Sequence, residues 1–385
     1  MMKADNMGTG LYIHIPFCVS KCSYCDFYSL PCGKNGREQE KAIYVAALCR
    51  QISVWGEMYG HPEIQSVYIG GGTPTILSSG QLTTISESLK NTFKLTPNAE
   101  FTVEANPKTF DREKLAALKK AGVNRLSIGM QSANDNELRL LSRIHTLKEL
   151  EGSFSAARES GIDNINLDIM YGIPSQTVES FRKTLNTVIA LSPEHVSVYG
   201  LQLEYGTRLY QNRGLYSFPG EDAETEMNAL AQDMLESAGY RRYEISNYAV
   251  PGRECRHNLL YWNALEYLGI GAGACSFKDR RRFRIRDDIM AYCKCSDFSD
   301  VTETEEIISD ENAAKEYIML QLRLCRGLEI KKLHDLTPDA EKYLTRARKY
   351  LSSGLVEENG GFIRFTPKGF NVSNTLLSEI LYSDN

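Results

Sequence analysis

The sequence predicts an α/β protein: a partial (β/α)6 barrel followed by a small C-terminal α+β domain with a winged-helix-like order of elements. Six short apolar segments alternate with helix-forming segments across the first 205 residues, which is typical of a parallel sheet with helices outside it. Six units fall short of the eight that close a full barrel. Beyond about residue 305 the chain is helical again, and it ends with a hairpin pattern around Asn359-Gly360-Gly361.

The expected elements follow the spacing of apolar residues and the stop signals between them. Strands are predicted from Leu11 and over 66–69, 99–105, 125–130, 164–170 and 195–203, and helices over 38–59, 79–94, 111–121, 134–142, 147–160 and 177–191. Gly60 and Gly122 mark helix ends, because glycine takes the conformation that terminates a helix. We therefore divide the chain into a barrel core (1–205), a less regular extension (206–300) and a C-terminal domain (301–385).

Three cysteines directly follow the first predicted strand. Cys18, Cys22 and Cys25 form a CxxxCxxC motif, and thiolates at this spacing are suited to three irons of a cubane iron–sulfur cluster. No fourth cysteine stands where a ferredoxin has one, because Asp26 and Phe27 follow. One iron would then keep an open coordination position.

Two alternatives remain open for this motif, a zinc site and three buried thiols. Cys32 would complete a zinc site. Structural zinc usually takes four ligands from two paired CxxC-type ends, however, and no second pair is evident.

Glycine-rich and polar motifs stand at the ends of other predicted strands. Gly70-Gly71-Gly72-Thr73-Pro74 follows one strand, and Glu104, Gln131 and Asp168 lie at or near the ends of others. The carboxyl ends of barrel strands form the active site, glycines let a backbone approach a ligand, and buried polar groups need partners. The pattern predicts a pocket for a polar ligand. Two alternatives stay open: the glycine motif is only a tight turn, and the polar residues have separate structural roles.

The cysteine motif, with Tyr24 just before its third cysteine, resembles that of the radical S-adenosylmethionine superfamily. The resemblance implies a 4Fe-4S cluster on the three cysteines and S-adenosylmethionine on the open iron, with the chemistry supplied by the cofactor. It also implies that Asp168 meets the ribose and Arg143 the carboxylate of S-adenosylmethionine. The implied pocket residues are Tyr12, Tyr24, Gly71, Gly72, Thr73, Glu104, Gln131, Arg143 and Asp168.

Longer segments resemble the oxygen-independent coproporphyrinogen III oxidase (HemN-like) family over about 190 residues. They are HIPFC, YIGGGTPT, TVEANP, NRLSIGMQS, NINLDIMYGIPSQT and HVSVYGLQLE, in this order. The dehydrogenase carries CxxxCxxCxC, whereas Phe27 takes the last of these positions here. The chain is therefore more similar to the HemW branch of haem chaperones, and its HNxxYW segment from His257 to Trp262 supports that branch.

The resemblance implies haem as cargo, and two places are candidates for its site. An imidazole can bind iron and aromatic rings can face a macrocycle, which makes His257, Tyr261 and Trp262 the first candidates. Cys275 is the second candidate iron ligand, and it stands where the branch usually has His. The alternatives are that His257 is a core histidine whose nitrogens are hydrogen-bonded within the protein, and that Cys275 is a small buried thiol. The basic run 278–286 is suited to haem propionates or forms a solvated strand face.

We therefore hypothesise a haem chaperone that binds haem and passes it to acceptor proteins, with no residue assigned as catalytic. The alternative is a radical enzyme that decarboxylates coproporphyrinogen III, and a third hypothesis is a radical enzyme acting on haem itself. Phe27 and the HNxxYW segment favour the chaperone, but the sequence leaves the question of an enzymatic activity open. The expected partners are haem, haem-accepting proteins, including respiratory, membrane-associated ones, and an electron donor such as flavodoxin or ferredoxin.

The composition further limits the functions and cellular locations that are expected for this protein. The formal net charge of −5 argues against a nucleic-acid or membrane-surface role, although winged-helix domains often bind DNA. No apolar run approaches the roughly 20 residues of a transmembrane span, and the N-terminal residues lack a secretory signal. Ten cysteines, three of them clustered, suit a reducing compartment. A cytoplasmic location is expected.

Overall fold

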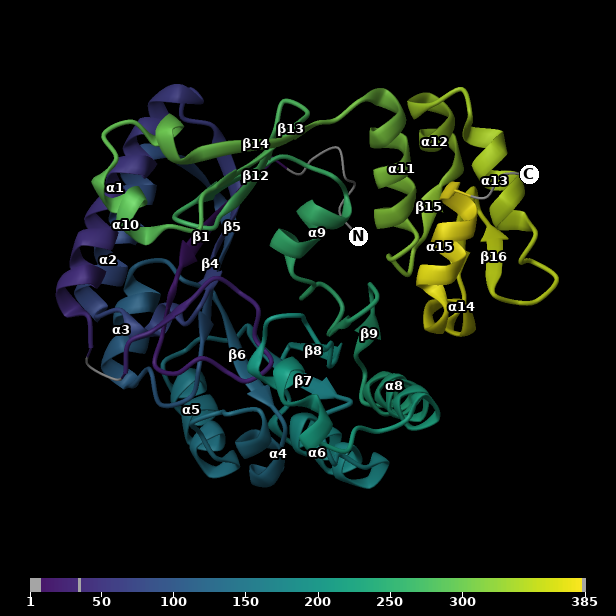
Figure 1. The fold of residues 1–385 in the computed structure, drawn as a ribbon, viewed down its shortest axis with the longest axis horizontal. Helices are drawn as coiled ribbons and strands as arrows, with labels where there is room; N and C mark the ends of the chain where they lie inside the picture. The colour runs from purple at the N-terminus through teal and green to yellow at the C-terminus, as the bar shows by residue number, and fades with distance from the viewer. Residues whose placement is uncertain (1–7, 34–35, 383–385) are drawn as a thin grey trace.

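The computed structural model describes residues 8–33 and 36–382 of the chain. In this part of the chain, twelve strands form one sheet in the order β14-β13-β12-β11-β1-β4-β5-β6-β7-β8-β10-β9 (Figure 1). The strands that form the wall of the functional site are β1 (Thr9–Ile15), β4 (Glu63–Gly71), β5 (Lys94–Ala105), β6 (Arg125–Gln131), β7 (Ile165–Tyr171) and β8 (His195–Gly200). Each pairs in parallel with the next, which confirms the predicted partial barrel.

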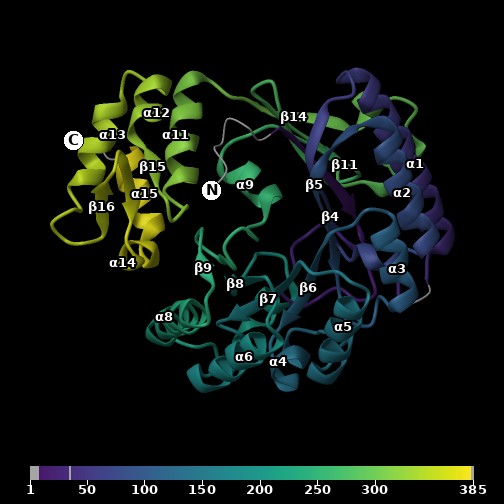
Figure 2. The ribbon, with the colours of Figure 1, turned by 180° about the vertical axis from the view of Figure 1, so that it is seen from behind.

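Helices cover the outer face of this parallel wall, as Figures 1 and 2 show. They are α1 (Glu38–Met58), α2 (Ser79–Thr92), α3 (Arg112–Lys120), α4 (Asp135–Leu140), α5 (Leu147–Glu159) and α6 (Val178–Leu191). Ser78, Thr146 and Thr177 each form a reciprocal capping box at the start of a helix, which satisfies backbone N–H groups that have no partner within the helix. The helices therefore begin close to the residues that the sequence predicts.

The parallel strands bury apolar side chains toward the helices and turn the alternate residues inward. On β1, Leu11, Ile13 and Ile15 are completely buried in the main core. Tyr12 points to the opposite face, because successive residues of a strand alternate, and its ring stacks on that of Tyr68 of β4 at a centroid distance of 6.3 Å. The inner face of the sheet is thus aromatic and polar.

The extension contributes strands to both edges of the same sheet. β11 (Tyr267–Ile270) pairs in parallel with β1, and β12 (Cys275–Lys278), β13 (Arg281–Ile285) and β14 (Thr302–Ile307) continue the sheet in antiparallel fashion. At the other edge, β10 (Asn247–Ala249) and β9 (Arg241–Arg242) follow β8. The helices of this region are α8 (Glu221–Ser237), α9 (Arg256–Trp262) and α10 (Ile289–Lys294). The sheet therefore continues past residue 205, and the sequence pattern does not predict this pairing of β11 with the first strand.

The C-terminal residues form a smaller α+β unit with its own hydrophobic core. Its helices are α11 (Asp310–Gln321), α12 (Ile330–Leu336), α13 (Ala340–Arg348), α14 (Pro367–Asn371) and α15 (Ser373–Tyr382), and its antiparallel sheet has the order β15 (Leu328–Glu329), β17 (Phe362–Phe365), β16 (Val356–Asn359). The predicted hairpin is confirmed, with Gly360 and Gly361 between β16 and β17 at φ values of 60° and 82°. Within the described ranges, no helix is both long and apolar enough to cross a membrane.

Candidate functional site

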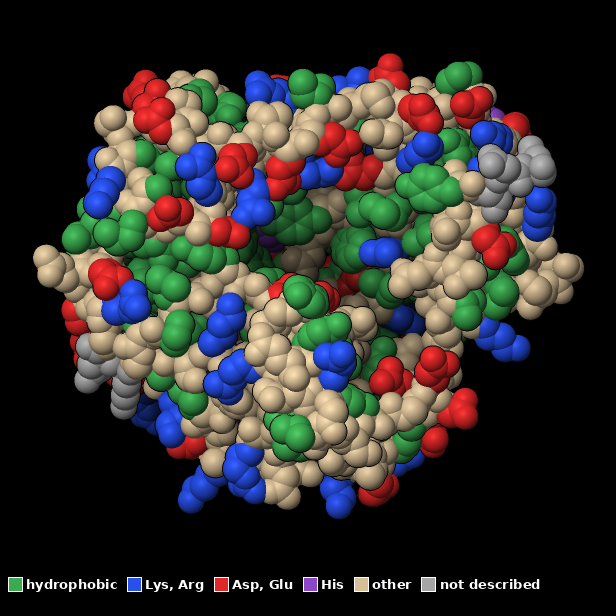
Figure 3. Space-filling model, in the orientation of Figure 1, with side chains coloured by type: hydrophobic (Ala, Val, Ile, Leu, Met, Phe, Trp, Pro, Cys, Tyr) green, Lys and Arg blue, Asp and Glu red, His purple; other side chains and the backbone are tan. Residues whose placement is uncertain are grey.

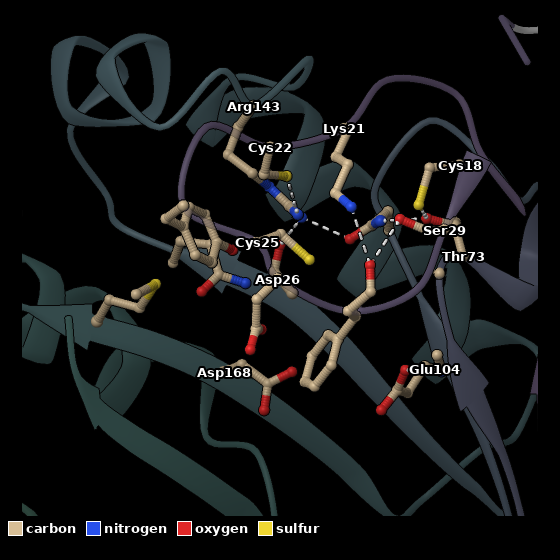
Figure 4. A pocket seen from close by; sticks show the side chains of 18 of the residues that line it. Cys18, Lys21, Cys22, Cys25, Asp26, Ser29, Thr73, Glu104, Arg143 and Asp168 are labelled. Carbon is tan, nitrogen blue, oxygen red and sulfur yellow. Dashed lines mark hydrogen bonds between the residues drawn. The ribbon is translucent and has the colours of Figure 1, made fainter. Parts of the chain in front are cut away.

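The loop with the three predicted cluster ligands leaves the end of β1 and folds over the carboxyl ends of the parallel strands (Figure 4). The short parallel pair β2 (Phe17–Cys18) and β3 (Leu30–Pro31) joins its two ends. Ser23 fixes its middle: the N–H and the hydroxyl donate to the carbonyls of Leu141 and Leu140 at 3.1 and 3.0 Å. The Ser23 carbonyl accepts the Leu209 N–H at 2.7 Å. The C-terminal end of α4 and the short helix α7 (Arg208–Gln211) therefore set the shape of this loop.

The three thiols line one cavity of about 370 Å³ that lies at the carboxyl ends of the barrel strands. Figure 4 shows the cysteines on one side of it and the carboxylates of Asp168 and Glu104 on the other. Eight of the nine positions implied for S-adenosylmethionine also line it: Tyr24, Gly71, Gly72, Thr73, Glu104, Gln131, Arg143 and Asp168. Tyr12 is not among the lining residues, and its hydroxyl contacts Nδ1 of His14 at 2.9 Å.

Hydrogen-bond donors reach two of the three sulfurs. The Thr73 hydroxyl donates to Sγ of Cys18 at 3.6 Å, and Nη1 of Arg143 donates to Sγ of Cys22 at 3.5 Å. Burial raises the pKa of the Cys25 thiol to about 11 and raises that of Cys18 as well. Burial therefore favours the protonated form of these two thiols, and a metal would bind them with release of protons.

The donor set fits an iron–sulfur cluster. All ten cysteines are free thiols, and the three that face the cavity are the type of ligand that such clusters take. Hydrogen bonds to ligand sulfurs are a feature of these sites as well. In the residues that the structure describes, no group of three His, Cys, Asp or Glu side chains is arranged to hold a single metal ion.

The glycine turn after β4 brings backbone against the cavity. Gly71 has a φ of +105°, and a Cβ there would lie 2.4 Å from the His14 ring. A Cβ on Gly72 would lie 2.6 Å from the carbonyl oxygen of Phe17. The Gly72 N–H in turn donates to the Ile15 carbonyl at 2.9 Å, at the end of β1. Side chains are therefore excluded at both positions, and the turn is open to a ligand on its other side.

Glu104, at the end of β5, is a half-buried acceptor beside this turn. Its Oε1 accepts the Tyr68 hydroxyl at 2.8 Å, and its Oε2 accepts the Gly71 N–H at 3.1 Å. Burial raises the pKa of Glu104 to about 7, although the bond from Tyr68 opposes the rise. The carboxyl is thus poised between its two protonation states near neutral pH, and a cationic ligand group would favour the ionised form.

Asp168, on β7, is the second carboxylate of the cavity. Its Oδ1 accepts Nδ2 of Asn166 at 2.8 Å, and its Oδ2 accepts the Ser127 hydroxyl at 3.3 Å. Burial raises the pKa of Asp168, and these donors oppose the rise. Each oxygen keeps a further acceptor position, which suits a ligand with hydroxyl groups.

Gln131 and Arg143 complete the polar wall. Gln131 has a φ of 63° and lies at a bulge of β6 next to Gly129, and such strain in a residue other than glycine is concentrated at functional sites. Arg143 donates to the Gly129 carbonyl at 2.7 Å and to Oδ1 of Asn106, besides its bond to Cys22. Its guanidinium therefore links the loop that carries the three cysteines to the ends of β5 and β6 by hydrogen bonds.

The sequence pattern does not single out Asn106, Ser127 and Tyr199, which also line the cavity. Asn106 donates to the Thr73 hydroxyl at 2.8 Å, so it orders the residue that contacts Cys18. Asn106 lies two residues after Glu104, and residues two apart on a strand share a face. That spacing is the signal by which it can be found.

Two family models match this chain, one over the barrel and one over the C-terminal unit. The model of the radical SAM superfamily matches residues 12–188, and that of the HemN C-terminal domain matches residues 308–372. Heme chaperone HemW of Bacillus subtilis (strain 168) is 37% identical over 339 residues, which cover 86% of each chain. Heme chaperone HemW of Lactococcus lactis subsp. lactis (strain IL1403) is 32% identical and covers 97% of each chain.

The chain belongs to the HemW family. Its fold is also that of coproporphyrinogen III oxidase (HemN) from Escherichia coli, which is described as a radical SAM enzyme. That structure superposes with a TM-score of 0.84 at 22% identity, covering 97% of this chain and 90% of that one. The resemblance drawn from the sequence motifs is therefore confirmed for the family and for the fold.

His257 of this HemW-family chain is a core residue at the start of α9. It is 1% exposed. Its Nδ1 pairs with the Ser66 hydroxyl and its Nε2 with the Tyr261 hydroxyl, both at 2.8 Å. Burial lowers the pKa of His257 to about 3, so the imidazole is neutral. To bind iron, His257 would have to give up one of these two hydrogen bonds.

The other predicted haem positions are more accessible. Tyr261 and Trp262 on α9 and Cys275 on β12 are all half-buried. The Tyr261 ring meets that of Tyr267 edge-on at a centroid distance of 4.6 Å, and Tyr267 lies two residues before Gly269, which precedes the turn to Cys275. Burial raises the pKa of the Cys275 thiol. Figure 3 shows a hollow in the middle of this face of the molecule, near α9, with hydrophobic side chains above it and acidic ones below.

The basic run from Lys278 to Arg286 is matched by acidic partners. Arg282 pairs with Glu306 at 3.1 Å and with Glu316, and Arg286 pairs with Glu303 at 2.9 Å. Lys278 pairs with Glu266, Arg280 with Asp310 and Arg284 with Asp287, and Arg281 donates to the Thr304 hydroxyl at 3.1 Å. The structure thus favours a paired, solvated strand face over a free site for propionates.

Proposed function

We propose that the protein is a haem chaperone that binds haem and transfers it to acceptor proteins, with a 4Fe-4S cluster and S-adenosylmethionine bound in its barrel. The observation that carries the cofactor part is that three thiols and two half-buried carboxylates, from segments far apart in the sequence, line one cavity. The haem part is supported by similarity over nearly the whole chain to proteins named heme chaperone HemW.

In this proposal, different residues of the cavity bind different parts of the cofactors. Cys18, Cys22 and Cys25 would hold the cluster, and a cluster with an open iron supplies a site for S-adenosylmethionine and one-electron chemistry. Glu104 would accept an ammonium group, because it is a half-buried carboxylate beside the glycine turn. Asp168 is placed to accept ribose hydroxyls.

Arg143 remains our candidate for the ligand carboxylate. Three of its contacts are already made, to the Gly129 carbonyl, to Asn106 and to Cys22. A carboxylate would have to share this guanidinium with them, which a planar group with five N–H donors allows. Tyr24 would pack beside the ligand, since it lines the cavity together with Met170.

For haem, we propose the hollow near α9, with Cys275 ahead of His257 as the iron ligand. Both nitrogens of His257 are bonded inside the core, whereas the thiol of Cys275 is half-buried on the neighbouring sheet. A cysteine thiolate is an established ligand of haem iron. Tyr261 and Trp262 would supply apolar contact to the macrocycle.

The test offers the anaerobically reconstituted protein haem and coproporphyrinogen III in parallel, with S-adenosylmethionine and a reductant in both. A chaperone binds about one haem per chain, passes it to an apo-haemoprotein and forms no protoporphyrinogen. Turnover of coproporphyrinogen III would establish the alternative, a radical SAM dehydrogenase. A cytoplasmic location and an electron donor such as flavodoxin or ferredoxin belong to the same proposal.

A further inference from the structure

A continuous series of side-chain hydrogen bonds leads from the cavity into the extension. Asn166 donates to Oδ1 of Asp168 at 2.8 Å. Oδ1 of Asn166 pairs with Nδ1 of His195 at 2.6 Å, and Nε2 of His195 pairs with the Tyr243 hydroxyl at 2.9 Å. Asn166 is 2% exposed and His195 is fully buried. Such buried polar groups are costly unless each is satisfied.

The Asp168 carboxylate determines which group donates and which accepts in every hydrogen bond of this series. A carboxylate only accepts, so the Asn166 amide must turn its NH₂ group toward it, and this group also reaches the Ser127 hydroxyl at 2.8 Å. The Asn166 oxygen then faces His195, which must donate from Nδ1. The remaining nitrogen of His195 accepts from Tyr243. Burial and the nearby Arg125 hold the pKa of His195 well below its ordinary value, in keeping with this neutral tautomer.

The far end of the series is anchored outside the barrel core. The Tyr243 hydroxyl accepts the Cys255 N–H at 3.4 Å, directly before α9. The Tyr243 carbonyl accepts the Cys325 N–H at 3.0 Å, in the C-terminal part of the chain. The orientation of Asp168 is thus linked by bonds to the extension and to the C-terminal domain.

We propose that Asn166, His195 and Tyr243 are positioning residues that hold the Asp168 carboxylate in the orientation required by S-adenosylmethionine. This inference rests on the proposed function, because it presumes that Asp168 meets the ligand. Asn166 and Ser127 each donate to one oxygen of Asp168, and these bonds would fix the carboxylate that lines the cavity. His195 fixes Asn166, and Tyr243 fixes the tautomer of His195.

The first experiment measures the affinity of the anaerobically reconstituted protein for S-adenosylmethionine by equilibrium dialysis. Asn166→Leu removes the donor to a carboxylate and should weaken binding by about tenfold or more. Tyr243→Phe removes a more distant hydroxyl and should weaken it about threefold to tenfold. Tyr240→Phe is the matched control. Its buried hydroxyl donates to the Pro193 carbonyl at 2.7 Å, outside the series, and the affinity should not change.

The second experiment separates positioning from general structural damage. His195→Asn keeps a donor where Nδ1 stands but has no atom at Nε2, so it should retain the parent affinity within about twofold, whereas His195→Leu should lose it as Asn166→Leu does. In the His195→Asn background, Tyr243→Phe should have no further effect on the affinity, because the bond between residues 195 and 243 is already absent and the bond from the Cys255 N–H lies outside the series.

Two outcomes overturn the inference while the proposed function stands. One is an unchanged affinity in Asn166→Leu and His195→Leu. The other is an equal effect of Tyr243→Phe in the parent and in the His195→Asn background. A parent protein that does not bind S-adenosylmethionine would overturn the proposed cavity itself, and this inference with it.

Discussion

The pH dependence of S-adenosylmethionine binding is the most direct test of the cavity. The pKa of Glu104 is about 7, so its ionised fraction falls from about nine-tenths at pH 8 to about one-tenth at pH 6. Only the ionised form attracts an ammonium group. Binding is therefore strong above the pKa and is lost as the pH falls through it, by about tenfold between pH 8 and pH 6.

The Glu104→Gln variant isolates this carboxyl from other titrating groups. Glutamine keeps the size of the side chain but loses the charge, and a hydrogen bond to a charged group contributes about 1.5–3 kcal/mol. At pH 8 we expect binding to weaken by about tenfold to 150-fold, with little remaining dependence on pH. Titrations of the parent and the variant across pH 6–8 also show any ionisation of the ligand itself, which is common to both.

A second substitution should shift the pH at which S-adenosylmethionine binding is lost, without abolishing the pH dependence. The Tyr68 hydroxyl donates to Glu104 at 2.8 Å and opposes the rise of its pKa. Tyr68→Phe should therefore raise the pKa of Glu104 further and shift the loss of binding to higher pH. A parent that binds equally well at pH 6 and pH 8, or a Glu104→Gln variant with the same dependence as the parent, would refute the role of this residue.

Three further predictions concern the cluster, the glycine turn and the haem. Cys22→Ala should abolish stable cluster assembly, measured by iron and sulfide content, whereas Cys32→Ala should not, and an intact cluster in Cys22→Ala would contradict the assignment. Gly71→Val should block S-adenosylmethionine binding, because a Cβ there would lie 2.4 Å from the His14 ring at a φ of +105°, and parental affinity in this variant would show that the pocket lies elsewhere. Cys275→Ala should change the ferric haem spectrum and weaken binding, while His257→Ala should leave the spectrum unchanged; the reverse result would make His257 the ligand.

The parts of the molecule that depend on local sequence could be predicted, and those that depend on distant pairing could not. The six strands of the parallel wall carry their own apolar pattern, and Ser78, Thr146 and Thr177 mark helix starts by their own side chains. β11 is only four residues long, next to several glycines. Nothing in those residues indicates that β1 is its partner, because parallel pairing joins segments far apart in the chain.

The candidate site shows the same limit. CxxxCxxC and the polar strand ends could be placed together because the ends of parallel strands meet at one edge. The resemblance implies that Tyr12 lies in the pocket, but Tyr12 is not among the residues that line the cavity, and its hydroxyl contacts His14. His257 shows the difference between residue type and environment. Its sequence motif favours a ligand, but one of its two hydrogen bonds is to Ser66, which lies far away in the chain.

The position of β1 between β4 and β11 has a consequence for synthesis of the chain. β1 leads directly into the cysteine loop, yet one of its two edges is covered only when residues 267–270 have been made. Until then a ribosome-bound chain exposes unpaired N–H and C=O groups along the strand that precedes the three cysteines, and such edges invite pairing with other chains. The nascent protein therefore passes through a long interval in which its cysteines are already translated but the sheet behind them is unfinished.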